Sequence, residues 1–104
     1  MTESHHILSQ QTIKQRVSQV AIKDKLNRPL TEAERHLLDT PLSVVLDDRR
    51  NQVRIKRTLH HRAHHGANPY RLKRSQLPRG LDDFACEYAL EGALDRAMQL
   101  VVDG

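Results

Sequence analysis

Ten lysine and arginine residues lie between Asp48 and Asp82, in a stretch of the chain that contains no acidic residue. These ten are Arg49, Arg50, Arg54, Lys56, Arg57, Arg62, Arg71, Lys73, Arg74 and Arg79. Cationic side chains neutralise phosphates and release condensed counterions, which supplies most of the sequence-independent affinity for nucleic acid. Arginine, which dominates this stretch, also binds phosphate through two parallel N–H bonds. The ten residues are therefore the candidate nucleic-acid-binding site.

Base recognition is not expected from this stretch, because Tyr70 is its only aromatic residue. Single strands are commonly held by several aromatic side chains on which successive bases stack. Glycines and prolines interrupt residues 60–80, so we expect an irregular basic loop or arm there. Such an arm suits contact with the phosphate backbone of DNA or RNA, or with a nucleoprotein complex.

The acidic end of the chain allows two other interpretations of this stretch. Residues 82–104 hold six acidic residues against Arg96 alone, a formal charge of −5, whereas the whole chain carries +4. The acidic end could pair with the basic stretch inside the molecule, or the basic stretch could dock on an acidic protein partner.

Four histidines form a second cluster with metal-binding spacing, at His60, His61, His64 and His65. Residues four apart share one face of a helix, so each of the two pairs could supply two metal ligands. No third ligand is evident, and His61 stands where a zinc protease has its glutamate base. We therefore expect no metal, and a polar surface whose positive charge rises as the pH falls through about 6.5.

No set of residues in the sequence composes an active site. The acidic pairs at 47–48 and 82–83 lie where turns and helix ends favour aspartate. Cys86 is the single cysteine, and we expect it on the apolar side of a helix, buried and inert. We expect a protein that is not an enzyme and needs no cofactor.

Two helices before the basic stretch have recognisable starts. Ser9 is a suitable N-cap for a helix that runs to about Lys25, in which apolar residues recur every three or four positions. Thr31 and Glu34 have the spacing of a capping box, which predicts a short helix over about Glu32–Leu38.

The segment 42–59 fits two structures. As a helix it has Pro41 at its start and an apolar face from Leu42 to Leu46. As a β-hairpin it has strands at 42–46 and 52–59, because apolar and polar residues alternate in the second part. We favour the helix and keep the hairpin, an α+β arrangement, as the alternative.

The last helix is expected over residues 82–102. Ala85, Ala89, Ala93 and Ala97 recur every four residues beside a row of larger apolar residues, which lets another helix approach closely. We expect this face to pack into the core of the protein, with a homodimer seam as the alternative.

These patterns predict a mainly α protein with a single domain over residues 1–104, three to four helices, a flexible N-terminus at 1–8 and the irregular basic arm. No apolar run approaches the ~20 residues that cross a membrane, and the N-terminus lacks a signal-peptide pattern, so we expect a cytoplasmic protein. The predicted function is that of an accessory or regulatory protein that binds nucleic acid. The alternative is a small adaptor or inhibitor that docks on an acidic protein and uses its C-terminal helix for assembly.

Overall fold

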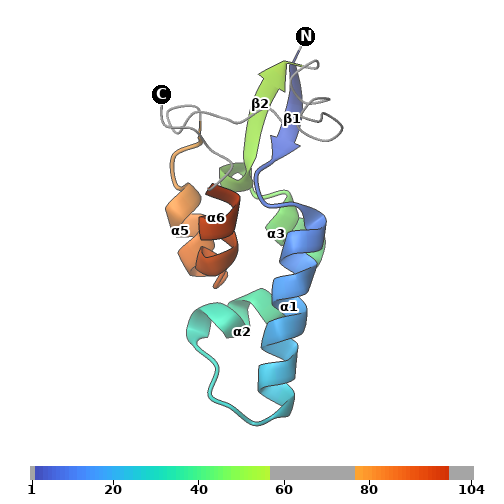
Figure 1. The fold of residues 1–104 in the computed structure, drawn as a ribbon, viewed down its shortest axis with the longest axis vertical. Coiled ribbons are helices and arrows are strands. Elements are labelled where there is room, and N and C mark those ends of the chain that lie inside the picture. Colours follow the sequence, from blue (N-terminus) through green and yellow to red (C-terminus); the bar gives the residue numbers. More distant parts are fainter. Residues whose placement is uncertain (1, 57–76, 99–104) are drawn as a thin grey trace.

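The structure is a computed structural model that describes residues 2–56 and 77–98 (Figure 1). Its elements are strand β1 (Thr2–His6), helices α1 (Gln10–Lys25), α2 (Glu32–Asp39) and α3 (Leu42–Leu46), the 3-10 helix η1 (Arg49–Asn51), strand β2 (Gln52–Lys56), and helices α5 (Leu81–Glu87) and α6 (Glu91–Met98). The prediction of a mainly helical fold is confirmed, with one small antiparallel sheet among the described residues. None of their helices combines the length and apolar character that a membrane span needs.

Helices α1 and α2 begin where the sequence places them. The Ser9 hydroxyl accepts a hydrogen bond from the Thr12 amide at 3.2 Å, which caps α1. At α2, the Thr31 hydroxyl accepts from the Glu34 amide at 3.1 Å, and the Glu34 carboxylate accepts from the Thr31 amide at 3.0 Å. Both bonds of the predicted capping box are therefore present.

Residues 42–56, the described part of the segment 42–59, combine parts of both predicted structures, and residues 57–59 lie outside the described residues. Residues 42–46 form the short helix α3, and residues 52–56 form strand β2. The partner of β2 is β1, in an antiparallel register that places Thr2 opposite Lys56 and His6 opposite Gln52. The expected flexible N-terminus is therefore wrong for residues 2–6, because these residues pair with a strand that is remote in the sequence.

The C-terminal segment is two helices rather than one. The chain turns between α5 and α6 at Ala89, which has a positive φ of 54°. There the Leu90 amide donates to the Ala85 carbonyl at 2.7 Å, a bond that spans five residues and ends the helical ladder. The prediction of one continuous helix over 82–102 is wrong within the described residues, and residues 99–102 lie outside them.

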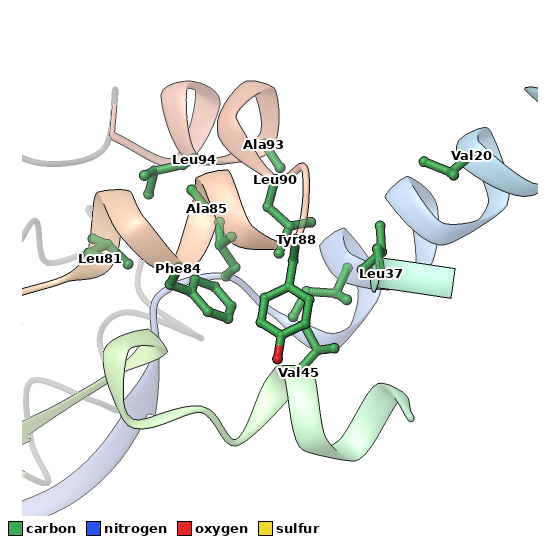
Figure 2. Packing of buried hydrophobic residues seen from close by; sticks show 12 residues of the cluster. Val20, Leu37, Val45, Leu81, Phe84, Ala85, Tyr88, Leu90, Ala93 and Leu94 are labelled. Atoms are coloured by element: carbon green, nitrogen blue, oxygen red, sulfur yellow. The ribbon is translucent and has the colours of Figure 1, made fainter. Parts of the chain in front are cut away.

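The core lies where α5 and α6 pack against the three N-terminal helices, and Figure 2 shows Phe84, Tyr88 and Leu90 pointing toward Leu37 and Val45. Three of the four alanines of the expected row take part, because Ala85, Ala89 and Ala93 are 5% exposed or less. The alanine face is therefore used inside the protein, as expected, and is not free to form a homodimer seam. The sheet lies at the opposite end of the molecule from the α1–α2 connection (Figure 1).

Candidate nucleic-acid interface

The structure describes five of the ten candidate residues: Arg49, Arg50, Arg54, Lys56 and Arg79. The other five lie outside the described residues: Arg57, Arg62, Arg71, Lys73 and Arg74. The histidine cluster at 60–65 lies outside them too. The described five come from η1, β2 and the turn before α5, so the two ends of the acid-free stretch can be compared directly.

Arg50 is held by two acids of the protein itself. Its guanidinium binds the Asp48 carboxylate through two bonds, from Nε at 3.0 Å and from Nη2 at 2.8 Å. The same Nη2 also donates to the Glu87 carboxylate on α5. The guanidinium carbon lies 5.7 Å from the centre of the Phe84 ring, within cation–π range. Arg50 therefore joins η1 to α5.

The electrostatics of this cluster favour the charged forms. The bond from the Arg50 side chain is the main cause that holds the pKa of Asp48 below its ordinary value near 3.8. The pKa of Arg50 is raised in turn, first by the bond to Asp48 and then by the bond to Glu87. The internal pairing that the charge pattern allowed is thus realised at Arg50.

The aliphatic part of Arg50 brings the two ends of the acid-free stretch together. A Cβ atom placed on Gly80 would lie 3.2 Å from Cδ of Arg50, and the backbone of Gly80 has a φ of +83°. Glycine alone adopts this conformation without strain and leaves room for the side chain. The turn that carries Arg79 is therefore packed against the 3-10 helix that carries Arg49.

Glu87 also pairs with His36, which lies on α2. The two side chains approach to 3.7 Å, and the His36 ring stacks on Tyr88 with ring centres 4.5 Å apart. The Glu87 carboxylate thereby contacts side chains of both η1 and α2, so it helps to hold these elements against α5.

Arg54 makes contacts of a different kind, across the sheet. Its guanidinium donates to the Thr2 hydroxyl at 3.2 Å and to the Thr2 carbonyl at 3.1 Å. Neither partner is acidic, so the positive charge of this exposed side chain is not neutralised by them. A guanidinium has five N–H donors, and those that Thr2 leaves unused could bind a phosphate.

Arg49 and Arg79 are exposed, and their side chains have no hydrogen bond or ion pair with any other described residue. Among the candidates whose side chains the structure describes, Arg49, Arg54 and Arg79 are those whose charge no acid of the described residues neutralises. The structure places Lys56 on β2, opposite Thr2 in the register of the sheet.

The excess of positive over negative charge lies outside the described residues. Residues 2–56 and 77–98 contain twelve lysines and arginines and twelve acidic residues, so their formal charges cancel. Residues 57–76 contain five basic residues and no acidic residue. The described residues are thus neutral overall, and the surplus of positive charge belongs to one segment of twenty residues.

Comparison with known proteins gives no further guide. This chain matches no protein family, no curated protein and no solved structure. Its function has to be inferred from its own residues.

Two other site predictions can be compared with the structure. Cys86 is exposed, so the prediction of a buried cysteine is wrong: α5 turns this position away from the core that Ala85 enters. Partial desolvation of the thiol, and then the charge of Glu91, raise the pKa of Cys86, which opposes nucleophilic chemistry. In the described part of the chain, no three His, Cys, Asp or Glu side chains gather as metal ligands would.

Sequence reasoning placed Asp48 where a turn or helix end favours aspartate, and it allowed acids of the last helix, Glu87 among them, to lie against the arginines. It assigned neither residue to Arg50, and it did not single out Thr2. Asp48 stands two positions before Arg50, and its side chain also accepts from the Arg50 amide at 2.9 Å, as an aspartate at a helix start commonly does. That local signal indicated the place of Asp48 but not its bonds to the Arg50 side chain. Glu87 and Arg50, like Thr2 and Arg54, are too far apart in sequence for their pairing to be found without the fold.

Proposed function

We propose that the protein is a non-enzymatic accessory or regulatory factor of the cytoplasm that binds the phosphate backbone of DNA or RNA, alone or within a nucleoprotein complex. The observation that carries the proposal is the separation of charge. The described residues, which are formally neutral as a whole, flank a segment with five cations and no acid. A cationic segment of this composition gains affinity by releasing the counterions condensed on nucleic acid.

Described residues extend this cationic segment at both ends. Arg54 on β2 precedes it and Arg79 follows it, and neither is neutralised by an acid of the described residues. Arg49 lies on η1, against which the turn of Arg79 packs. Arg50 is left out of the proposed contact set, because Asp48 and Glu87 already use its guanidinium.

The proposal is tested by fluorescence anisotropy with duplex DNA and single-stranded RNA of mixed sequence, at several salt concentrations. In the test variant Arg57, Arg62, Arg71, Lys73 and Arg74 are replaced by glutamine. In the matched control the exposed residues Lys14, Lys25, Arg28, Arg35 and Arg96 are replaced by glutamine, which changes the net charge by the same amount.

The wild type and the control variant should bind, and the slope of log affinity against log salt should be about −0.9 for each phosphate contacted on duplex DNA. The test variant should lose most of this affinity and most of this slope. Equal losses in the two variants would show that total charge alone drives binding. Absence of binding at low salt would refute the proposal and favour the alternative of an adaptor on an acidic protein, whose complex would survive nuclease treatment.

A further inference from the structure

An apolar hollow lies between helices α1, α2 and α3. It has a volume of about 260 Å³. Its lining residues are Ile13, Lys14, Val17, Ser18, Leu37, Leu38, Thr40, Leu42 and Val45. Six of these nine are aliphatic and Lys14 is the only charged one. The hollow is large enough for one or two aliphatic side chains of a partner.

The apolar surface continues from the hollow along α1. Lys14, Ser18, Ile22 and Leu26 succeed one another every four residues and therefore form one ridge of the helix. Ile22 is 59% exposed and Leu26 is 60% exposed, which makes them, with Val44 on α3, the large apolar residues most open to solvent in the described part of the chain. The ridge spans about 18 Å at 1.5 Å per residue, the length of three helical turns.

Charged residues at the two ends of the ridge indicate what kind of partner fits it. Lys14 lies at one end of the ridge, Lys25 and Arg28 lie at the other, and Asp24 is the single exposed acid on α1. A second copy of α1 packed antiparallel on this ridge would bring Lys14 of one copy toward Lys25 of the other, which opposes a homodimer here. A partner segment with acidic residues at both ends has the complementary charge.

We propose that this ridge and hollow form a docking site for an amphipathic helix of a partner protein, with one aliphatic anchor in the hollow, further aliphatic residues over Ile22 and Leu26, and acidic residues at both ends. Helices bind grooves in this way through anchors spaced three to four residues apart. The site is separate from the proposed nucleic-acid contacts, which lie on η1, on β2 and before α5.

The test uses two synthetic helical peptides of about 15 residues, a length that covers the ridge. One carries leucines along one face and glutamates at both ends, and its twin has lysine in place of each glutamate. Methyl NMR of the full chain should show saturable shifts at Val17, Ile22, Leu38, Leu42 and Val45 with the glutamate peptide. The lysine twin should bind about tenfold more weakly, as expected for the loss of a few exposed charge pairs.

Ile22→Glu and Lys14→Glu should each weaken binding of the glutamate peptide. Arg96→Glu, an exposed charge reversal on α6, should not. All three sites are on the surface, so the variants should fold, which the NMR spectra check directly. Equal binding of both peptides, shifts that spread over α5 and α6, or absence of shifts at millimolar peptide would overturn the proposal. A dimer that Ile22→Glu abolishes would overturn it in favour of a second copy as occupant.

Discussion

The carboxamide of Asn51 closes two hydrogen bonds on the backbone of Leu8: its Oδ1 accepts from the Leu8 amide at 2.8 Å, and its Nδ2 donates to the Leu8 carbonyl at 3.0 Å. Nδ2 also donates to the Leu46 carbonyl at 3.1 Å. Asn51 is completely buried, so one side chain joins the start of α1, the end of α3 and the start of β2. This arrangement holds the sheet onto the helices.

Replacement of Asn51 by leucine should destabilise the protein strongly. The variant would remove the bonds of Asn51 to the Leu8 amide, the Leu8 carbonyl and the partly buried Leu46 carbonyl. A buried group left without a partner costs about 1–3 kcal/mol. We expect a loss of about 2–4 kcal/mol in the free energy of unfolding, measured by urea denaturation. Gln11→Leu, at an exposed position of α1, is the control and should change stability little. A small effect of Asn51→Leu would mean that water replaces the lost bonds.

Glu34 should make the stability of the protein depend on pH in the acidic range. Its carboxylate is buried and binds the Thr31 amide and Lys23, and these bonds, the one to Thr31 first, lower its pKa below the ordinary value near 4.5. Because the folded-state pKa is the lower one, this stabilisation is complete above about pH 4.5 and is lost as the pH falls through the folded value. Thermal unfolding between pH 7 and pH 2.5 should show this loss, and Glu34→Gln should have a lower and flatter profile. Parallel profiles would contradict the assignment.

Arg50→Lys should destabilise the contact between η1 and α5, because lysine cannot bind Asp48 through two bonds or stack on Phe84. We expect a cost of about 1–2 kcal/mol in the free energy of unfolding.

Arg50→Gln, studied below its unfolding temperature, should leave the salt dependence of nucleic-acid binding unchanged. Arg79→Gln should reduce the slope of log affinity against log salt by the amount expected for about one phosphate contact. The reverse order would place Arg50 among the contacts.

Ala89→Gly should be neutral or stabilising. An L-residue with a left-handed backbone pays about 1–2 kcal/mol, which glycine avoids. The same change at Ala85, inside α5, should cost about 1–2 kcal/mol, because glycine there adds freedom to the unfolded chain and removes a buried methyl group. Chemical denaturation of both variants checks the contrast. Similar losses at the two sites would show that the Ala89 methyl group matters more than its backbone.

Cys86 should react slowly with iodoacetamide although it is exposed. Its raised pKa keeps the thiol protonated, and the midpoint of the rate against pH should lie above that of a free cysteine. Glu91→Gln should lower this midpoint, since Glu91 is one of the groups that raise it. A midpoint unaffected by Glu91→Gln would assign the shift to desolvation alone.

Features with a local cause were predictable from the sequence. Ser9, Thr31 and Glu34 bind backbone groups within three positions, so their types and spacing were enough to find the starts of α1 and α2. Strand β2 was indicated by its alternation only in the alternative hairpin, over residues 52–59, of which 57–59 lie outside the described residues. The partner expected there, residues 42–46, is wrong, because β2 pairs with β1. Nothing in the polar residues at 2–6 indicates a strand until β2 is placed beside them.

The turn at Ala89 and the contacts of Arg50 were not predictable for the same reason. Alanine favours continuation of a helix, and only the packing of α6 back on α5 forces a positive φ there. The sequence shows which side chains could bind phosphate, but their availability depends on partners such as Glu87 that the fold supplies. Half of the candidate residues lie in 57–76, outside the described residues. For these, the availability of the side chains to phosphate stays a prediction from the sequence.

The pairing of β1 with β2 sets an order of events during synthesis. The first strand leaves the ribosome early, but the residues opposite it, from Gln52 to Lys56, follow only after three helices. The contacts within those helices are local and can form first, whereas the sheet must wait for a long loop to close. The Ile7 amide then donates a hydrogen bond to the Asn51 carbonyl at 2.9 Å, next to the paired residues His6 and Gln52. Until that moment the nascent N-terminal strand presents unpaired backbone groups to other chains.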